Sequence, residues 1–414
     1  LVGNFTVTEN IILGKEGGFV LHRKEASARI KTLSEKYGLN IDPDMKIEDI
    51  SVGMQQRVEI LKMLYCDADI LIFDEPTAVL TPQEIDELMR IIRNLVKEGK
   101  SVVIITHKLN EIKAVADRCT IIRRGKLIDV VDVASTDTAL MAAKMVGRPV
   151  NFKVEKSAPK TGRPVLEVKN LCVMNAKKLL GVKNFSLTVH AGEIVGLAGV
   201  DGNGQTELVE AICGLVPAES GSVIIGGTDA TNLTVRKRNE LGLGHIPEDR
   251  IKRGLIASLR IAENMVVKSY YRKPFSGNGI LNFPEINSYS EEIVRKFDVR
   301  SGEGINSPAG KLSGGNQQKM IVGREISMNP ELLIAVQPTR GLDVGAIEYI
   351  HSQIVAHRDK GNAVLLVSLE LDEIFNLSDR IAVISGGELM NIVDTASTDE
   401  HSVGLMMAGV RDKK

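Results

Sequence analysis

The residues best suited to chemistry are two adjacent carboxylates, Asp74 and Glu75, which follow a short apolar run at 70–73. A carboxylate at the end of a buried strand can hold Mg²⁺, and its neighbour can polarise an attacking water. His107 follows the next apolar strand, expected at 102–106, one βα unit further along the chain. Apolar runs that end in Asp-Glu are common, and a lone histidine is more often structural than catalytic. The interpretation therefore depends on the surrounding motifs.

A glycine-rich run, GVDGNGQT at 199–206, lies between an apolar strand at 193–199 and a helix expected at 207–213. Its spacing is that of a phosphate-binding loop, in which backbone N–H groups surround phosphates at a helix N-terminus. Gln205 stands in place of the usual lysine, and Thr206 stands where a hydroxyl binds Mg²⁺. An amide carries no charge, so we expect nucleotide binding without hydrolysis; the alternative is a glycine-rich turn with no ligand. The candidate nucleotide-binding residues are Gly199, Gly202, Asn203, Gly204, Gln205 and Thr206.

A serine–glycine motif occurs twice, as LSGGNQQ at 312–318 and as SVGMQQR at 51–57. Physically, such a motif is a serine-capped helix start followed by glycines. The same feature can bind a phosphate through the serine hydroxyl, the glycine amides and the helix N-terminus. In the first copy, Val52 and Met54 are expected to hinder that approach. The second copy offers the candidate binding residues Ser313, Gly314, Gly315 and Asn316.

These motifs belong to two copies of one domain, because equivalent residues lie 262 positions apart. The spacing pairs Asp74 with Val336, Glu75 with Gln337, and His107 with Leu369. Valine cannot bind Mg²⁺, and an amide cannot accept a proton as a carboxylate does. The carboxylate site of the second copy is therefore predicted to be inactive.

The motif set resembles the fused two-domain ATP-binding subunits of ABC importers, in the simple-sugar and nucleoside group (ribose-type, associated with basic membrane proteins). The resemblance covers nearly the whole chain. It implies an α/β fold with tandem ABC-type P-loop NTPase domains, each with a mixed sheet core, an α-helical subdomain and an antiparallel β edge. It also implies ATP and Mg²⁺ as cofactors. His107 matches the histidine switch that contacts the γ-phosphate, and Asp343 matches the loop aspartate after the second strand motif, where the first copy has Thr81.

Domains of this family pair head to tail, so each nucleotide lies between the phosphate loop of one copy and the serine–glycine motif of the other. The resemblance thus implies one competent and one degenerate composite site. The competent site combines Asp74, Glu75 and His107 with Ser313, Gly314, Gly315 and Asn316. The degenerate site combines Gln205, Val336, Gln337 and Leu369 with the altered motif at 51–54.

The implied function is ATP hydrolysis that energises an importer. The stretch at 2–14 favours nucleosides as cargo, whereas IPEDR at 246–250 occurs in both branches, so a monosaccharide importer (ribose- or galactoside-type) is the alternative. The implied partners are two integral-membrane permease subunits and an extracytoplasmic substrate-binding protein, with the chain peripheral at the cytoplasmic face of the cell membrane. A soluble tandem ABC ATPase that acts on ribosomes is a further class. Such proteins carry a long charged helical linker, and the linker at 151–163 is short and of mixed charge.

Composition limits the other possibilities. The net charge of −1 over 414 residues gives no electrostatic argument for nucleic-acid binding. The longest apolar runs are about seven residues, whereas a membrane-spanning helix needs about 20, so no direct insertion into the membrane is expected. The four cysteines have no paired spacing, and we expect reduced thiols packed as small apolar residues.

The pattern divides the chain into a first ABC ATPase domain at 1–150, a polar linker at 151–163 and a second ABC ATPase domain at 164–414. Glu9 aligns with Glu263, so the first copy has almost nothing where the second has about 90 residues and a phosphate loop. The chain also begins with Leu1. We therefore expect an N-terminally truncated protein that is inactive alone. An insertion at 272–279, rich in proline and glycine, is expected to be an irregular, mobile surface loop.

Overall fold

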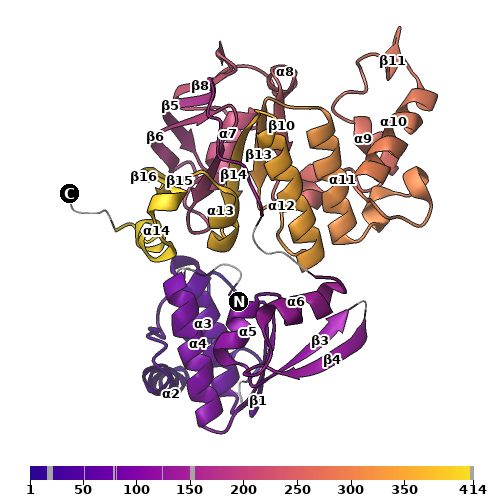
Figure 1. The fold of residues 1–414 in the computed structure, drawn as a ribbon. Helices are drawn as coiled ribbons and strands as arrows, with labels where there is room; N and C mark the ends of the chain where they lie inside the picture. The colour runs from indigo at the N-terminus through magenta and orange to yellow at the C-terminus, as the bar shows by residue number, and fades with distance from the viewer. Residues whose placement is uncertain are drawn as a thin grey trace. The chain divides into compact units, whose positions relative to one another are not determined.

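The computed structural model describes residues 1–15, 22–50, 52–77, 80, 82–123, 125–149 and 154–410, with only the backbone described at Val52 and Pro82. Ser51, Thr81 and the first residues of the expected linker, 151–153, lie outside the described residues. Contacts within the chain divide it into two compact units, Leu1–Pro149 and Val150–Lys414 (Figure 1).

The first unit packs helices against one face of a short parallel ladder. β1 (Ile70–Asp74) pairs in parallel with β2 (Ser101–Ile105), and α4 (Pro82–Lys97) connects them. This is the βαβ alternation that the sequence predicts. Leu71 and Phe73 of β1 are buried among helix side chains. The remaining elements are α1 (Val7–Ile12), α2 (Arg23–Lys36), η1 (Ile47–Asp49), α3 (Val52–Tyr65), α5 (Leu109–Val115), the antiparallel pair β3 (Arg118–Arg123) and β4 (Lys126–Asp132), and α6 (Thr138–Val146).

The second unit contains a mixed sheet. In its described residues the strand order is β10–β13–β14–β7–β15–β16, and β16 is antiparallel to its neighbour. The strands are β7 (Ile194–Ala198), β10 (Leu243–Ile246), β13 (Leu332–Val336), β14 (Ala363–Ser368), β15 (Arg380–Ser385) and β16 (Glu388–Asp394). Every residue of β7, β13 and β14 is buried, as expected for parallel strands that are covered on both faces.

A second, antiparallel sheet has the order β6–β5–β8–β9. Its strands are β5 (Pro164–Met174), β6 (Leu180–His190), β8 (Ser220–Ile225) and β9 (Thr228–Asp229). The two sheets confirm the mixed core and the antiparallel edge that the resemblance implies. A group of helices, α9 (Ile261–Val266), α10 (Phe283–Lys296) and α11 (Gly314–Ser327), forms the helical subdomain.

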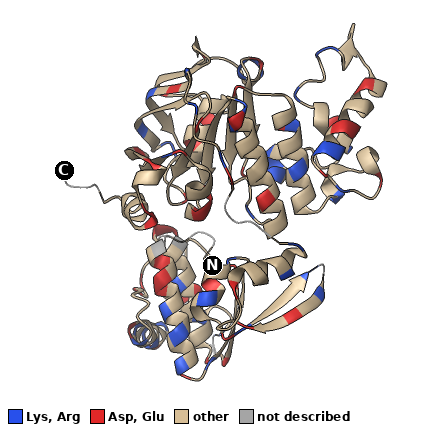
Figure 2. Cartoon of the chain, in the orientation of Figure 1, with Lys and Arg blue, Asp and Glu red and all other residues tan. Residues whose placement is uncertain are grey.

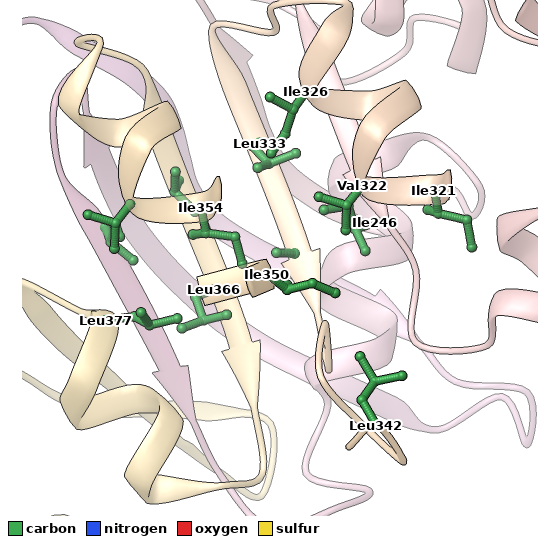
Figure 3. Packing of buried hydrophobic residues seen from close by; sticks show 14 of the residues in the cluster. Ile246, Ile321, Val322, Ile326, Leu333, Leu342, Ile350, Ile354, Leu366 and Leu377 are labelled. Atoms are coloured by element: carbon green, nitrogen blue, oxygen red, sulfur yellow. The ribbon is translucent and has the colours of Figure 1, made fainter. Parts of the chain in front are cut away.

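Helices also pack directly on the mixed sheet. Figure 3 shows Ile350 and Ile354 of α12 (Val344–Asp359) against Leu333 and Leu366 of the central strands. Full burial of such a side chain contributes roughly 1.5–3 kcal/mol. The other elements of this unit are α7 (Gln205–Cys213), α8 (Val235–Glu240), η2 (Arg250–Gly254), β11 (Ser276–Gly277), β12 (Ile280–Leu281), η3 (Gly304–Asn306), η4 (Ala309–Lys311), α13 (Leu371–Leu377), η5 (Thr395–Ser397) and α14 (Glu400–Met407).

The equivalent ladders of the two units differ on one face. Ile70 and Ile72 of β1 are 65% and 61% exposed, whereas their counterparts Leu332 and Ile334 are fully buried. In the second unit, the antiparallel sheet and α7 belong to the core cluster that covers this face. β7 also lies between β14 and β15 there, while β2 and β3 belong to separate sheets, with no strand between them in the described part of the first unit.

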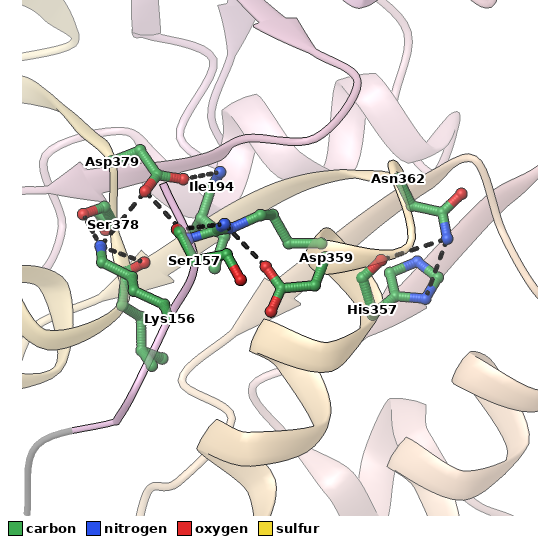
Figure 4. A network of polar contacts seen from close by, with 10 residues as sticks. Lys156, Ser157, Ile194, His357, Asp359, Asn362, Ser378 and Asp379 are labelled. Carbon is green, nitrogen blue, oxygen red and sulfur yellow. Dashed lines mark hydrogen bonds and ion pairs between the residues drawn. The ribbon is translucent and has the colours of Figure 1, made fainter. Parts of the chain in front are cut away.

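The described part of the expected linker, 154–163, has no regular secondary structure, yet it is bonded to the second unit (Figure 4). Lys156 Nζ donates to Ser378 O at 2.6 Å and lies 3.3 Å from Asp379 Oδ1. Arg358, 2% exposed, donates to Ser157 O at 2.9 Å and pairs with the same Asp379 oxygen at 3.3 Å. Burial lowers the pKa of Lys156, and the Asp379 carboxylate opposes that effect. These contacts fix the segment to the second unit, which polar composition alone does not predict.

The insertion at 272–279 also differs from the expectation of an irregular loop. It contributes to a short antiparallel hairpin of β11 and β12. Phe275 is buried, with its ring centroid 4.9 Å from that of Tyr289 on α10. An apolar anchor in the insertion therefore supports regular structure that the proline and glycine content obscured.

The composition-based expectations have mixed outcomes. All four cysteines lie in the described residues and are free, but Cys66 is exposed, so the expectation that every thiol is packed was wrong for that residue. Burial raises the pKa of Cys213 to about 12, which keeps it an unreactive thiol. Among the described residues, no helix is both long and apolar enough to span a membrane. Figure 2 shows acidic and basic residues interspersed along the ribbon of each unit.

Candidate functional site

The best-formed catalytic arrangement in the first unit is at the carboxyl end of β1 and β2. Glu75 directly follows β1, and its backbone N–H donates to Ile105 O at 2.9 Å. This bond fixes the turn, in which Glu75 has the left-handed φ of +46°. His107 follows β2, and its Nδ1 lies 2.9 Å from Glu75 Oε1. The structure thus brings together two residues that the sequence places 32 positions apart.

Carboxylate oxygens at this turn remain available to a ligand. Glu75 Oε2 is buried and makes no hydrogen bond to any described residue, so it is an acceptor available for a water or a hydroxyl. Asp74, one residue earlier, is exposed at the strand end. An exposed carboxylate next to an unpaired carboxylate oxygen fits Mg²⁺, which is usually held by one or two carboxylates together with substrate phosphates. No group of three or more metal-binding side chains occurs among the described residues, and such a site does not require one.

The second unit has the same backbone turn, but the carboxylate and histidine side chains are replaced. Gln337 has a φ of +47°, and its N–H donates to Val367 O at 2.8 Å, in the register of Glu75. Val336, in the place of Asp74, is buried and offers no oxygen. Leu369 replaces the histidine. The side chains at this strand end therefore do not fit Mg²⁺.

The phosphate loop of the second unit has the backbone that the motif predicts. Gly202 and Gly204 have φ of +80° and +103°, and Gly204 is the N-cap of α7. A Cβ at Gly204 would lie 2.4 Å from Gly181 O, so this close approach requires glycine. A Cβ at Gly199 would lie 2.8 Å from Ile384 O, which has the same consequence. The loop and the N-terminus of α7 fit a phosphate group.

Two side chains of this loop are bonded to backbone groups of the second unit. Gln205 is buried, and its Nε2 donates to Val200 O at 2.9 Å. Asn203 Nδ2 donates to the same carbonyl at 3.0 Å, and Asn203 Oδ1 accepts from Gly386 N at 2.5 Å. Thr206 is exposed at the start of α7. Its predicted role as a Mg²⁺ ligand lacks the partner carboxylate that Val336 replaces.

The serine–glycine motif of the second unit begins a helix as expected. Ser313 is the exposed N-cap of α11, and its hydroxyl makes no cap bond to the helix. Asn316 Nδ2 donates to Ser313 Oγ at 2.9 Å, and Asn316 Oδ1 accepts from Arg300 N at 2.8 Å. A Cβ at Gly314 would come within 3.1 Å of the Arg250 guanidinium, and Gly315 meets nothing closer than 3.7 Å. The helix start is accessible, fixed by Asn316, and has a cation beside it.

Comparison with known proteins identifies the family. The ABC transporter family model matches residues 1–78 and 182–340. The nucleoside import ATP-binding protein NupA of Lactococcus lactis subsp. cremoris is 56% identical over 99% of the chain and 81% of that protein. The guanosine import ATP-binding protein NupO of Bacillus subtilis is 53% identical over 100% of the chain and 81% of that protein. The ribose import ATP-binding protein RbsA of Bacillus licheniformis is 37% identical over 98% and 81%.

The chain belongs to the ABC transporter family. It is an ABC-type ATPase, and the resemblance drawn from its motifs is confirmed. The matched segments include the carboxylate pair in the first ABC unit and the phosphate loop and serine–glycine motif in the second. Binding of nucleotide is a property of the family. The role of each individual residue remains a prediction.

Sequence reasoning overlooked a buried acid in each ABC unit. Glu111 on α5 and Glu373 on α13 lie 262 positions apart, as the catalytic motifs do. Each is at most 5% exposed and bonded to hydroxyls beside the catalytic turns. An acidic residue in the first turn of a short helix is usually interpreted as solvent-exposed, because the positive end of the helix dipole favours a negative charge there. The repeat spacing was the signal that could have identified the pair.

Proposed function

We propose that this ABC protein is the ATP-binding subunit that energises nucleoside import. The observation that carries the proposal is the difference in similarity between cargo classes. Identity is 56% and 53% to the two relatives named for nucleoside and guanosine import, but 37% to the relative named for ribose import. A relative named for glucose import, TsgD13 of Haloferax volcanii, is 40% identical. Sugar import is therefore the alternative that the experiment must separate.

The catalytic proposal assigns hydrolysis to the competent composite site. Glu75 Oε2, buried and unpaired, is the acceptor for a proton of the attacking water. With both ring nitrogens protonated, His107 Nδ1–H would donate to the other oxygen of Glu75, 2.9 Å away, and Nε2–H would donate to the γ-phosphate. Mg²⁺ held by Asp74 would neutralise charge on the β- and γ-phosphates. Head-to-tail pairing would bring Ser313 and the exposed start of α11 to the same phosphate.

The degenerate site follows from the same residues. The phosphate loop of the second unit offers N–H groups and glycine geometry for nucleotide. A ligand for Mg²⁺, a general base and a switch histidine are all missing, because the corresponding residues are Val336, Gln337 and Leu369. We therefore assign nucleotide binding without hydrolysis to this site.

We further propose that two integral-membrane permease subunits and an extracytoplasmic substrate-binding protein are the partners, with the protein peripheral at the cytoplasmic face of the cell membrane. The ATPase does not contact the cargo, so cargo is tested by transport. In cells from which the gene has been deleted, either the wild-type gene or its Glu75→Gln variant is reintroduced. Uptake of labelled guanosine, adenosine and ribose is then measured. We expect the wild-type gene alone to restore nucleoside uptake. Restoration of ribose uptake without nucleoside uptake would overturn the assigned cargo.

A further inference from the structure

A buried carboxylate joins the two loops that carry the catalytic pair. Glu111 lies on α5 and is 5% exposed. One of its oxygens, Oε1, accepts a hydrogen bond from the Thr77 hydroxyl. The other, Oε2, accepts from the Thr106 hydroxyl at 3.1 Å. Thr77 is two residues after Glu75, and Thr106 is the residue before His107. One side chain therefore binds both loops.

The bonds around Glu111 leave it little freedom. Thr106 Oγ1 also accepts from Lys108 N at 3.0 Å, so this hydroxyl is fixed both as a donor and as an acceptor. Lys108 Nζ lies 3.9 Å from Glu111 Oε1 and provides a countercharge. A buried carboxylate without such partners would be strongly destabilising. Here both oxygens are satisfied, and each bond holds a catalytic loop to α5.

The second ABC unit keeps part of this arrangement beside residues that cannot catalyse. Glu373 is 4% exposed, and its Oε1 accepts from the Thr339 hydroxyl at 2.7 Å and lies 2.9 Å from His351 Nε2, while its Oε2 has no partner among the described residues. Burial alone would raise the pKa of Glu373, but the contacts with His351 and Thr339 hold it below its ordinary value. Thr339 and Ser368 are the counterparts of Thr77 and Thr106.

Comparison of the two units distinguishes two possible roles for the buried carboxylate. Glu373 bonds the loop that carries Gln337, where no hydrolytic chemistry remains. A carboxylate that acted on substrate would have no use there. A carboxylate that holds the loop beside it in place would be useful in both units.

We propose that Glu111 is a positioning residue for ATP hydrolysis, which fixes the spacing of Glu75 and His107 by binding Thr77 and Thr106. This inference rests on the proposed catalytic roles of Glu75 and His107. Glu111 is buried, and both of its oxygens are bonded to threonine hydroxyls, which leaves neither of them for a phosphate. Its removal allows the two loops to move apart, which lengthens the 2.9 Å contact between the base and the histidine.

The test compares matched variants of the two units in the assembled transporter. Glu111→Gln keeps size and burial but replaces one acceptor oxygen by a donor amide, so one hydroxyl loses its bond. Displacement of a catalytic group by about 1 Å can cost about 100-fold in rate. We expect kcat for ATP hydrolysis to fall about 10- to 100-fold, with KM for ATP changed less than about threefold, because phosphate contacts are untouched. Glu373→Gln is the control, with kcat within about twofold of wild type.

A second pair of variants, at Thr77, tests the same contact in case Glu111→Gln does not fold. Thr77→Val removes the hydroxyl but keeps the shape, and Thr77→Ser keeps the hydroxyl. We expect Thr77→Val to lower kcat as Glu111→Gln does, and Thr77→Ser to restore it. Equal effects of the Glu111 and Glu373 variants, or equal activity of the two Thr77 variants, would overturn the inference. If Glu75→Gln, measured alongside, retained wild-type turnover, the proposed catalytic site itself would be wrong, and the positioning role would fall with it.

Discussion

Glu75 and Gln337 occupy the same strained backbone position in the two ABC units but differ in what their side chains can do. Their φ angles are +46° and +47°, and each backbone N–H is bonded to the next strand, at 2.9 and 2.8 Å. Only Glu75 faces a histidine, His107, at 2.9 Å. The turn is therefore maintained by the strand ladder in both units, and the two turns differ in their side chains.

The first prediction concerns Glu75. Glu75→Gln keeps the turn, because its backbone bond to Ile105 is unchanged, but an amide cannot accept the proton of the attacking water. We expect ATP turnover by the assembled transporter to fall about 10²- to 10⁴-fold, the usual range for removal of a general base. Nucleotide affinity, measured by equilibrium binding, should stay within about threefold of wild type. Turnover above about a third of wild type would contradict the assignment.

The second prediction reverses the same substitution in the other unit. Gln337→Glu places a carboxylate on a turn of the correct geometry, yet Val336 still offers no Mg²⁺ ligand and Leu369 cannot hold the new base. Gln205 also lacks the charge of a phosphate-loop lysine. Catalytic groups that act as a unit are strongly non-additive, so we expect turnover to change less than about 1.5-fold. A doubled steady-state rate would show that the second site is closer to competence than its side chains indicate.

Much of the fold and site could be predicted from the sequence because the chain contains two copies of one domain, so each motif can be compared with its counterpart. The two strands, expected at 70–73 and 102–106, end within one residue of expectation, at Asp74 and Ile105. The helix that starts after Ser313 and the parallel pairing of β1 with β2 agree with expectation. These features depend on local periodicity, capping residues and short connections. Such signals are visible in a single sequence.

The features that were missed depend on particular side-chain hydrogen bonds, some of them between residues distant in sequence. From the local sequence, Glu111 resembles a solvent-exposed acidic residue at the start of a helix. In the structure it is buried and bonded to hydroxyls 34 and 5 positions away. Lys156 looks like a linker residue, and its partners lie more than 200 positions further on. Gln205 was expected to face a phosphate, but in the structure its amide is bonded to Val200 O. Local pattern carries no information about these pairings.

The third prediction concerns the acid stability of the second unit. His357 is 1% exposed, and burial lowers its pKa from 6.5 to about 4. Between these values the unfolded chain binds a proton that the folded chain does not, so the free energy of unfolding decreases as pH falls from 6.5 to 4. One such histidine contributes a slope of at most about 1.4 kcal/mol per pH unit. Burial likewise lowers the pKa of His245 to about 4, which adds to the same window.

Urea unfolding at several pH values between 7.5 and 4.5 measures this slope. His357→Leu removes the proton uptake, so its free energy of unfolding should depend less steeply on pH than that of wild type, by up to about 1.4 kcal/mol per unit. His401→Leu, at an exposed position, is the control and should follow the wild-type slope. Parallel curves for wild type and His357→Leu would show that this histidine is not buried in its neutral form.

The last prediction compares the two serine–glycine motifs. Ser313 caps α11 at an exposed position, and Asn316 orients its hydroxyl at 2.9 Å. In the proposed head-to-tail pairing, this helix start meets the γ-phosphate of the competent site. Ser313→Arg fills that space with a long side chain and removes the hydroxyl, so we expect ATPase activity and nucleoside uptake to fall at least tenfold, about 1.4 kcal/mol or more in transition-state stabilisation.

Ser51→Arg makes the same change at the motif that faces the degenerate site. That site already lacks a Mg²⁺ ligand, a base and a switch, so the loss of ATPase activity should be several-fold smaller than for Ser313→Arg. Thermal unfolding of both variants shows whether the two substitutions destabilise the fold to a similar extent. Equal losses of activity at comparable stability would mean that both composite sites contribute alike, and the asymmetric assignment drawn from Glu75 and Gln337 would then be wrong.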